Sequence, residues 1–337
     1  MKTNILVIYT GGTIGMIKDP ETAQLKSVDF NLIYDHVPEL KRLNVELTTK
    51  SFEKPIDSSE INIEDWKAMA SMIELAYNDF DGFVILHGSD TMAYSSSALS
   101  FMFDGLRKPI IFTGSQLPIG TIRTDGKENL ITAIEIAAAK ADNGEALIQE
   151  VAVYFDYKLF RGNRCTKVSA EHFEAFKSPN YAELASAGVN IIYNYQYFYR
   201  TSNAELSVNY DLNTKVALLK LHPGIDFSLY EGLFDFSRTK AVILETFGAG
   251  NSPSSDVFRA LLKKFIEAGG IVLNITQCNS GSVKQGMYAT SSMFEQLGVI
   301  SGIDMTTEAA VTKLMVVLND QNPRELLKSN FRGELTL

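Results

Sequence analysis

The sequence contains little cysteine, which excludes a disulfide scaffold and a metal centre built on thiolates. Only two of the 337 residues are cysteines. Cys165 and Cys278 lie far apart in the chain, without the close spacing of zinc ligands, and one pair cannot form a framework of disulfides. We therefore expect two reduced thiols and no bound metal.

A long apolar run and an excess of positive charge are also missing. No window approaches the roughly 18 consecutive apolar residues of a membrane span. The N-terminal apolar run, residues 5–9, leads directly into a glycine-rich turn without the small-residue cleavage site of a signal peptide. A net charge of −9 argues against nucleic acid, whose phosphates attract basic surfaces. We therefore expect a cytoplasmic protein with neither membrane nor nucleic acid as a partner.

The residues that are present predict buried strands separated by helices. The composition, 45% apolar and 21% charged, is that of an ordinary globular protein. Apolar runs without alternation, typical of strands buried on both faces, occur at residues 5–9, 82–86, 109–113 and 151–155. Helices are expected from the Asn62 cap onward, from about 91 to 105, and after residue 125. The apolar face of the first would contain Trp66, Met69, Ile73 and Ala76.

This alternation predicts an α/β fold with a doubly wound, mostly parallel sheet and helices on both faces. Because 337 residues exceed the usual size of one hydrophobic core, two domains are expected. The pattern weakens where tyrosine and asparagine dominate, which suggests an N-terminal domain over 1–190, a linker over 191–213 and a smaller α/β domain over 214–337. In the smaller domain a helix is expected over 255–268, with its inward residues Val257, Leu261, Leu262 and Phe265.

Small and hydroxyl-bearing residues follow the predicted strands of the first domain. The strand ends are continued by TGGTIG at 10–15, HGSDT at 87–91 and TGSQ at 113–116, and a further loop contains DSS at 57–59. In open α/β sheets ligands bind beyond the carboxyl ends of the strands, so these side chains should converge. The turn at 10–15 lacks the spacing of a dinucleotide fingerprint and the lysine of a phosphate loop, which argues against a dinucleotide-dependent dehydrogenase.

In combination, these segments resemble the signatures of bacterial L-asparaginases, closest to the cytoplasmic type I branch. The resemblance extends in order over nearly the whole chain. It includes RGNRCTK at 161–167, GAGN at 248–251, TQC at 276–278 and FRGELT at 331–336. It implies hydrolysis of L-asparagine to L-aspartate and ammonia, without a metal or organic cofactor. A threonine-linked acyl-enzyme would be the intermediate, because a carboxamide is a poor electrophile.

The resemblance also assigns roles to residues. Thr13 matches the family's nucleophile, and Lys167 matches its catalytic lysine, which would act through the hydroxyl of Ser89 provided that its surroundings favour a neutral amine. The backbone N–H of Ser89, with that of Thr13, would hold the oxyanion. Asp90 would bind the α-ammonium of the substrate. The remaining substrate contacts would come from the loop residues Asp57, Ser58, Ser59 and Ser115.

Simpler interpretations exist for these residues. Ser89 and Asp90 are common helix N-caps, Ser58 suits a turn, and an isolated lysine such as Lys167 is usually a solvated surface residue. His87 is interpreted as a structural residue at a strand end and not as a base.

The chain also departs from the family pattern at three places. Glu245 stands where an allosterically regulated relative has an arginine for effector asparagine, so no allosteric asparagine site of that kind is expected. The family usually has threonine where this chain has Ser89. Many relatives have a tyrosine in the loop after the nucleophile, yet residues 17–28 contain none, and Tyr288 is a candidate substitute.

Three other functions stay open in the sequence. A mixed glutaminase-asparaginase differs by one methylene of substrate, which is worth only about 1–3 kcal/mol of discrimination. A subunit of a transfer-RNA-dependent amidotransferase would carry an extra N-terminal domain. A non-catalytic amino-acid-binding module would keep Asp90 and Ser58 but would not need Thr13 or Lys167. By resemblance we expect a homodimer or homotetramer, with Asn251 contributing across an interface.

Overall fold

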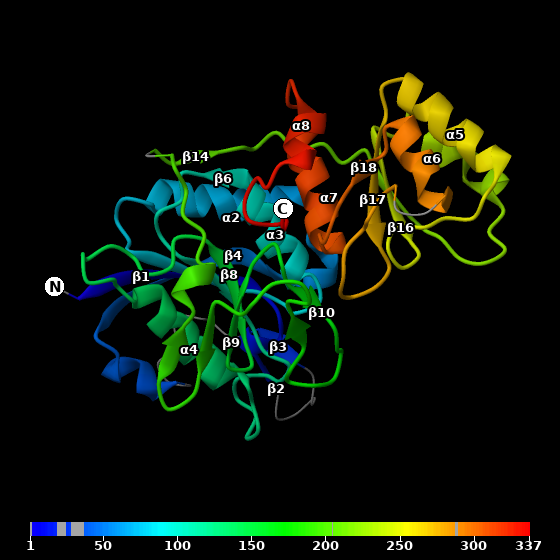
Figure 1. Ribbon diagram of the computed structural model, residues 1–337. Coiled ribbons are helices and arrows are strands. Elements are labelled where there is room, and N and C mark those ends of the chain that lie inside the picture. The colour runs from blue at the N-terminus through cyan, green and yellow to red at the C-terminus, as the bar shows by residue number, and fades with distance from the viewer. Residues whose placement is uncertain (1, 19–24, 28–36, 204, 287–288) are drawn as a thin grey trace. The chain divides into compact units, whose positions relative to one another are not determined.

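The computed structural model divides the chain into two compact units, Met1–Val208 and Asn209–Leu337. It describes all residues except 1, 19–24, 28–36, 204 and 287–288 (Figure 1). None of the helices in the described part of the chain is long and apolar enough to cross a membrane.

The first unit is built on an eight-stranded sheet with the order β13-β12-β9-β8-β7-β5-β1-β4. The strands are β1 (Thr3–Gly11), β4 (Val45–Ile56), β5 (Gly82–Leu86), β7 (Ile110–Thr113), β8 (Val151–Phe155), β9 (Lys158–Arg161), β12 (Ala185–Ala187) and β13 (Ile191–Tyr193). The five strands from β4 to β8 pair in parallel, and β9, β12 and β13 add an antiparallel edge. The expected mostly parallel sheet is confirmed.

Helices cover both faces of this sheet, as the sequence predicts. α2 (Ile63–Ala76) and α3 (Met92–Met102) lie on one face and α4 (Gly126–Ala138) on the other (Figure 1). Asn62 caps α2 in a capping box with Asp65. The indole N–H of Trp66 donates to Ser95 Oγ at 2.9 Å, which ties α2 to α3. The predicted apolar face of α2 is buried.

The short elements of the first unit lie in the connections between these strands and helices. They are β2 (Met16–Lys18), β3 (Leu25–Ser27), β6 (Phe103–Asp104), β10 (Thr166–Lys167), β11 (Phe176–Lys177), β14 (Ser207–Val208), and the 3-10 turns η1 (Thr13–Gly15), η3 (Pro38–Arg42), η4 (Ser58–Glu60) and η5 (Tyr195–Tyr197). The hairpin of β10 and β11 matters most here, because it carries Lys167.

The expected linker begins too early, because residues 191–208 belong to the first unit. β13 pairs with β12, and β14 pairs with β6. A buried ion pair between Arg161 and Glu150, with 2.6 Å between Nε and Oε2, holds the tyrosine-rich stretch in place. Arg161 donates to the carbonyl of Tyr197, and Glu150 accepts from the N–H of Tyr199. The unit therefore ends at residue 208, because these contacts dock a segment whose composition is typical of a connection.

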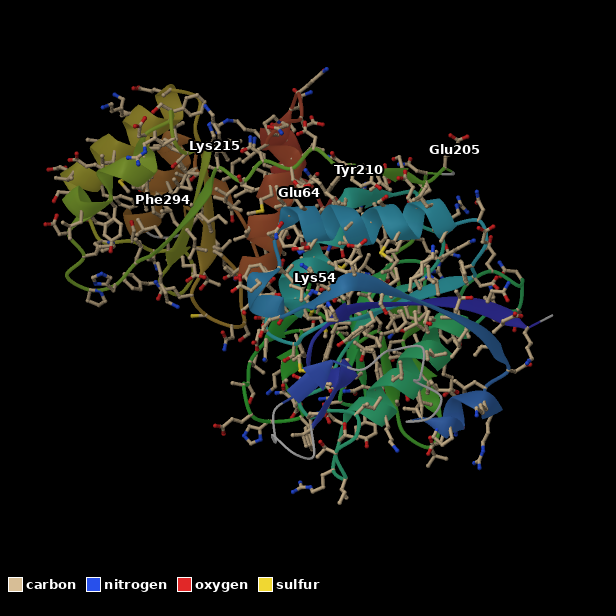
Figure 2. The ribbon with its side chains drawn as sticks, turned by 180° about the vertical axis from the view of Figure 1, so that it is seen from behind. Lys54, Glu64, Glu205, Tyr210, Lys215 and Phe294 are labelled. Carbon is tan, nitrogen blue, oxygen red and sulfur yellow. The ribbon has the colours of Figure 1, made fainter. Side chains whose placement is uncertain are left out.

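The second unit contains a separate parallel sheet with the order β15-β16-β17-β18. Its elements are β15 (Val216–Lys220), η6 (Phe227–Phe234), β16 (Ala241–Thr246), α5 (Asp256–Glu267), β17 (Ile271–Thr276), α6 (Ala289–Leu297), β18 (Ile300–Ser301), α7 (Thr307–Val317) and α8 (Pro323–Lys328). The core is aromatic, with the rings of Phe227 and Phe258 stacked at 4.0 Å and Phe294 edge-on to Phe258 (Phe294 is labelled in Figure 2).

The inward face of α5 is rotated relative to the sequence prediction. Phe258, Leu262 and Phe265 are buried, whereas Val257 is 51% exposed. Residues 257, 261 and 265 and residues 258, 262 and 265 both have helical spacing. In the structure Phe258 starts the buried face. The assignment of Val257 as an inward residue was wrong.

A fully buried ion pair fastens the C-terminal segment to the second unit. Lys313 in α7 pairs with Glu334, and both side chains are 0% exposed. Glu334 also accepts hydrogen bonds from the N–H groups of Phe331 and Arg332 at 3.0 and 2.6 Å. Removing one partner of such a pair leaves a buried charge without compensation, which costs about 3–5 kcal/mol.

We therefore expect Lys313→Met to destabilise the second unit by about 3–5 kcal/mol in urea denaturation. Circular dichroism should follow the transition, because the single tryptophan, Trp66, reports on the first unit. Lys328→Met is the matched control: its amine pairs with Glu325 at the surface, so the change should stay below about 0.5 kcal/mol. Equal midpoints for the two variants would contradict the proposed importance of the buried pair.

Candidate active site

Three loops meet at the carboxyl edge of the first sheet because two glycines allow their backbones to touch. A Cβ placed on Gly12 would lie 2.5 Å from the backbone nitrogen of Gly88, and a Cβ on Gly88 would lie 2.5 Å from Ser58 Oγ. Gly12 also has a positive φ of 84°, which side chains rarely adopt. The loop after β1, the loop after β5 and the Ser58 turn are therefore packed against one another.

Thr13 lies at the start of the 3-10 turn η1, directly after Gly12. The turn is anchored by the buried Ile14 and by Tyr9, whose ring occupies the place that a side chain at Gly15 would need. Thr13 itself is half-buried. The contact between Gly12 and Gly88 therefore brings the predicted nucleophile beside the segment that carries Ser89.

Lys167 points at Ser89 and Asp90. Its Nζ donates to Ser89 Oγ at 2.9 Å and to Asp90 Oδ1 at 2.5 Å. The lysine side chain is only 15% exposed, whereas the Asp90 carboxylate is 67% exposed. Lys167 is therefore no solvated surface lysine, and Asp90 presents its carboxylate to solvent and to any ligand.

Gln116 belongs to the same hydrogen-bonded chain, although sequence reasoning did not select it. Ser89 Oγ donates to Gln116 Oε1 at 3.2 Å, and Gln116 Nε2 donates to the carbonyl of His172 at 3.0 Å. The Asp125 carboxylate fixes this loop by accepting from the backbone N–H groups of Gln116 and Leu117. Gln116 comes shortly after the buried strand β7, where ligand-binding residues gather in α/β sheets. This position was the sequence signal that could have identified Gln116 as a site residue.

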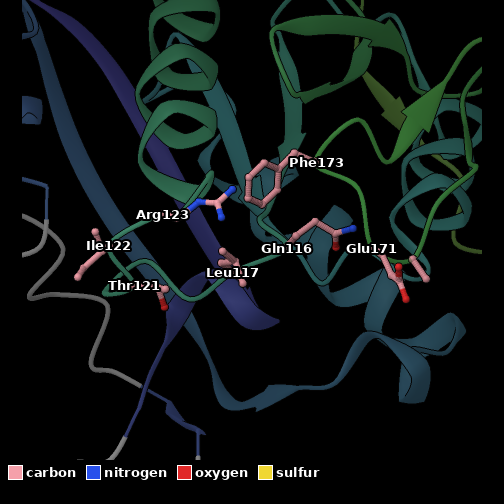
Figure 3. Close-up of a pocket in the computed structure, with 8 residues that line it drawn as sticks. Gln116, Leu117, Thr121, Ile122, Arg123, Glu171 and Phe173 are labelled. Carbon is pink, nitrogen blue, oxygen red and sulfur yellow. The ribbon is translucent and has the colours of Figure 1, made fainter.

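Gln116 also lines a cavity of about 650 Å³ beside this chain of hydrogen bonds. Figure 3 shows Leu117 and Arg123 from the loop after β7, and Glu171 and Phe173 from the segment after β10. The cavity therefore adjoins the hydroxyl of Ser89 through one amide side chain.

The Ser58 turn is shaped by local hydrogen bonds. Asp57 accepts from the N–H and the hydroxyl of Ser59, each at 2.9 Å, and these two bonds lower the pKa of the Asp57 carboxyl. Ser58 is buried against Gly88, and its carbonyl accepts from Thr91 Oγ1 at 2.7 Å. Of the three residues, Ser58 is the one held directly against the Ser89 segment.

The other predicted site residues are Ser115, Tyr288 and Asn251. Ser115 is buried, and its hydroxyl donates to the carbonyl of Leu117 at 2.6 Å, which shapes the loop. Tyr288 lies outside the described residues. Asn251 belongs to the second unit, where it closes a tight turn by pairing with Phe247.

Comparisons with known proteins relate the chain to one family. A model of the asparaginase N-terminal domain matches residues 4–199, and a model of the glutaminase/asparaginase C-terminal domain matches residues 215–331. L-asparaginase 1 of Escherichia coli (strain K12) is 39% identical over 340 residues, which cover 99% of this chain and 98% of that protein.

Two solved structures are similar over the whole chain. L-asparaginase I from Vibrio cholerae has a TM-score of 0.89 and 38% identity, with 100% of both chains covered. The thermostable L-asparaginase from Thermococcus kodakarensis has a TM-score of 0.89 and 30% identity, with 99% of this chain and 100% of that chain covered.

Proposed function

The chain belongs to the asparaginase family, and on this basis we propose that it hydrolyses L-asparagine to L-aspartate and ammonia through an acyl intermediate on Thr13. The observation that carries the mechanism is the 2.9 Å hydrogen bond between Lys167 Nζ and Ser89 Oγ, beside the turn of Thr13. An alcohol is a weak nucleophile at neutral pH and needs a base. Lys167 supplies that base through Ser89.

Acylation proceeds by proton transfer along this chain. Thr13 Oγ attacks the side-chain carbonyl carbon of asparagine while its proton passes to Ser89 Oγ and the Ser89 proton passes to Lys167 Nζ. The oxyanion that forms is held by the backbone N–H of Ser89, with that of Thr13. Collapse of the tetrahedral intermediate breaks the carbon–nitrogen bond, and the proton returns through Ser89 to the leaving ammonia. Water then attacks the ester by the same route and releases aspartate.

The ion pair between Lys167 and Asp90 joins the proton relay to the substrate-binding carboxylate. Lys167 Nζ donates to Asp90 Oδ1 at 2.5 Å, and the Asp90 carboxylate is 67% exposed. The α-ammonium of asparagine binds this exposed carboxylate, so the substrate is held beside Ser89 and Lys167.

The Ser58 turn recognises the α-carboxylate of the substrate. Ser58 is packed on Gly88, next to Ser89 and Asp90, so it can bind the carboxylate while Asp90 binds the ammonium. Ser59 contributes from the neighbouring position. Asp57 acts by holding Ser59, since a carboxylate repels another, and Ser115 acts by shaping its loop.

We extend the proposal to the setting of the enzyme by resemblance to type I L-asparaginases. We propose a cytoplasmic enzyme that assembles as a homodimer or homotetramer, with Asn251 and Tyr288 as further contributors to the site. Glutamine is a slower substrate under the same mechanism, because discrimination of one methylene is worth about 1–3 kcal/mol.

Hydroxylamine tests the covalent intermediate. With asparagine and wild-type enzyme, hydroxylamine should compete with water for the acyl group and yield aspartyl β-hydroxamate alongside aspartate. Both products and ammonia are measured over a range of hydroxylamine concentrations. Ammonia release with no hydroxamate at any concentration would contradict the acyl-enzyme, and absence of ammonia release would leave a binding module as the function.

Ser89→Thr should keep kcat at the wild-type value or raise it by a few-fold, as measured by ammonia release. Threonine keeps the hydroxyl that Lys167 and Gln116 contact, and its β-branch restricts χ1, which holds the hydroxyl in one rotamer. Ser89→Ala is the comparison: without the relay, kcat should fall by about 10²–10⁴-fold. A large fall in the threonine variant would count against the relay.

A further inference from the structure

His87 is a buried histidine that the mechanism above does not use. It follows β5, is 0% exposed, and packs its ring edge-on to Phe112 at 5.8 Å. Burial lowers the pKa of His87 to about 4, so the ring is neutral at physiological pH. A neutral imidazole has one N–H donor and one acceptor nitrogen, and the partner of each decides which is which.

The hydrogen bonds of the ring determine its tautomer. Nδ1 lies 2.7 Å from the carbonyl oxygen of Gly88, which can only accept, so Nδ1 carries the proton and donates. Nε2 is then an acceptor, and among the described residues it has no hydrogen-bond partner. A buried nitrogen without a donor facing it gives no route for exchanging a proton with a substrate. His87 is therefore a donor to the backbone and not a general base.

This hydrogen bond fixes the orientation of the peptide unit that follows. The peptide between Gly88 and Ser89 is planar and trans, so its N–H points in the direction opposite to its carbonyl. The carbonyl is held against the ring of His87. The N–H of Ser89 is thereby turned away from the ring, and no acceptor for it is present in the described part of the chain.

We propose that His87 is a positioning residue for the oxyanion hole: its Nδ1–H holds the Gly88 carbonyl so that the N–H of Ser89 is aimed at the developing oxyanion. Glycine at position 88 has no side chain to restrain its own backbone, and one face of it is closed by Ser58 and another by Gly12. The imidazole supplies the restraint that the glycine lacks. The role rests on the proposed function, because it acts through the Ser89 N–H.

Two amide variants separate this role from simple packing. In His87→Asn the side-chain nitrogen reaches the place of Nδ1 and can donate to the Gly88 carbonyl, whereas in His87→Gln it reaches the place of Nε2. His87→Leu fills the cavity without any donor. A misdirected oxyanion donor lowers the stabilisation of the transition state more than that of the bound substrate. The loss should therefore appear in kcat.

We expect His87→Asn to keep kcat within a few-fold of wild type, and His87→Gln and His87→Leu to lower it by about 10²-fold, with KM little changed in all three. Steady-state ammonia release gives kcat and KM, and urea denaturation establishes that each variant is folded. If the leucine variant does not fold, the asparagine and glutamine variants decide the question between them.

Equal rates for the asparagine and glutamine variants, wild-type kcat in the leucine variant, or a loss confined to KM would overturn the proposal. Thr13→Ala, assayed in parallel, separates this failure from failure of the proposed function. If Thr13→Ala is inactive while His87→Gln is fully active, only the role of His87 is wrong. If Thr13→Ala turns over normally, the assignment of Thr13 as the nucleophile is wrong, and so are the roles proposed for the residues that act on it.

Discussion

Thr13→Ala should abolish asparagine hydrolysis, lowering kcat by at least about 10⁴-fold, because no acyl-enzyme can form without the hydroxyl. The turn that carries Thr13 is fixed by the contact between Gly12 and Gly88, by Ile14 and by Tyr9. These contacts do not involve the threonine side chain. The variant should therefore fold and bind aspartate as wild type does, which calorimetry can measure beside the ammonia assay.

Two further variants test whether the loss of kcat is due to the missing hydroxyl at position 13. Thr13→Ser keeps a hydroxyl at the same position and should retain a measurable part of kcat. Thr48→Ala changes an exposed threonine on β4 and should leave kcat unchanged. Normal turnover in Thr13→Ala would contradict the assignment of Thr13 as the nucleophile.

Lys167→Met should lower kcat by about 10²–10⁴-fold, the usual contribution of a positioned general base. Methionine fills a similar volume but offers neither a proton acceptor nor a charge. The Ser89 hydroxyl would then have Gln116 as its remaining partner in the described site and no route for its proton. The measurement is kcat for ammonia release, with Lys67→Met, which removes an exposed ion pair on α2, as the control.

Lys167→Arg decides whether the amine acts as a base or only as a counter-ion of Asp90. Arginine keeps the positive charge but does not lose its proton in proteins. If Lys167 is the base, the arginine variant should be about as slow as the methionine variant. Recovery of most of the wild-type kcat by arginine would show that the ion pair with Asp90 is the whole contribution, and another base would be required.

The strands and helices that surround the site could be predicted because their patterns are local. The central residues of β1, β5, β7 and β8 form uninterrupted apolar runs, since helices cover both faces of the sheet. The Asn62 cap and the apolar face of α2 follow from hydrogen bonding and helical period alone.

The predictions of the fold were wrong where a segment packs against residues that are distant in the sequence. The tyrosine-rich stretch before residue 208 has the composition of a linker, yet Arg161 and Glu150 bind its backbone. In α5 the apolar residues Val257 and Phe258 are adjacent, and only contact with the aromatic core determines which of them is buried. Neither outcome is encoded in a local pattern.

The sequence by itself determined the family, the sheet type and the identity of the residues proposed to act, because glycines, hydroxyls and a lysine recur in motifs of fixed order. Only the tertiary structure decided how those residues meet. Lys167 and Ser89 are 78 residues apart in the chain, and Ser89 and Gln116 are 27 apart. The direction in which His87 donates is likewise a property of a folded loop. A hydrogen bond depends on ångström-scale distances and on angles, and those are set by packing between strands that the chain order does not place side by side.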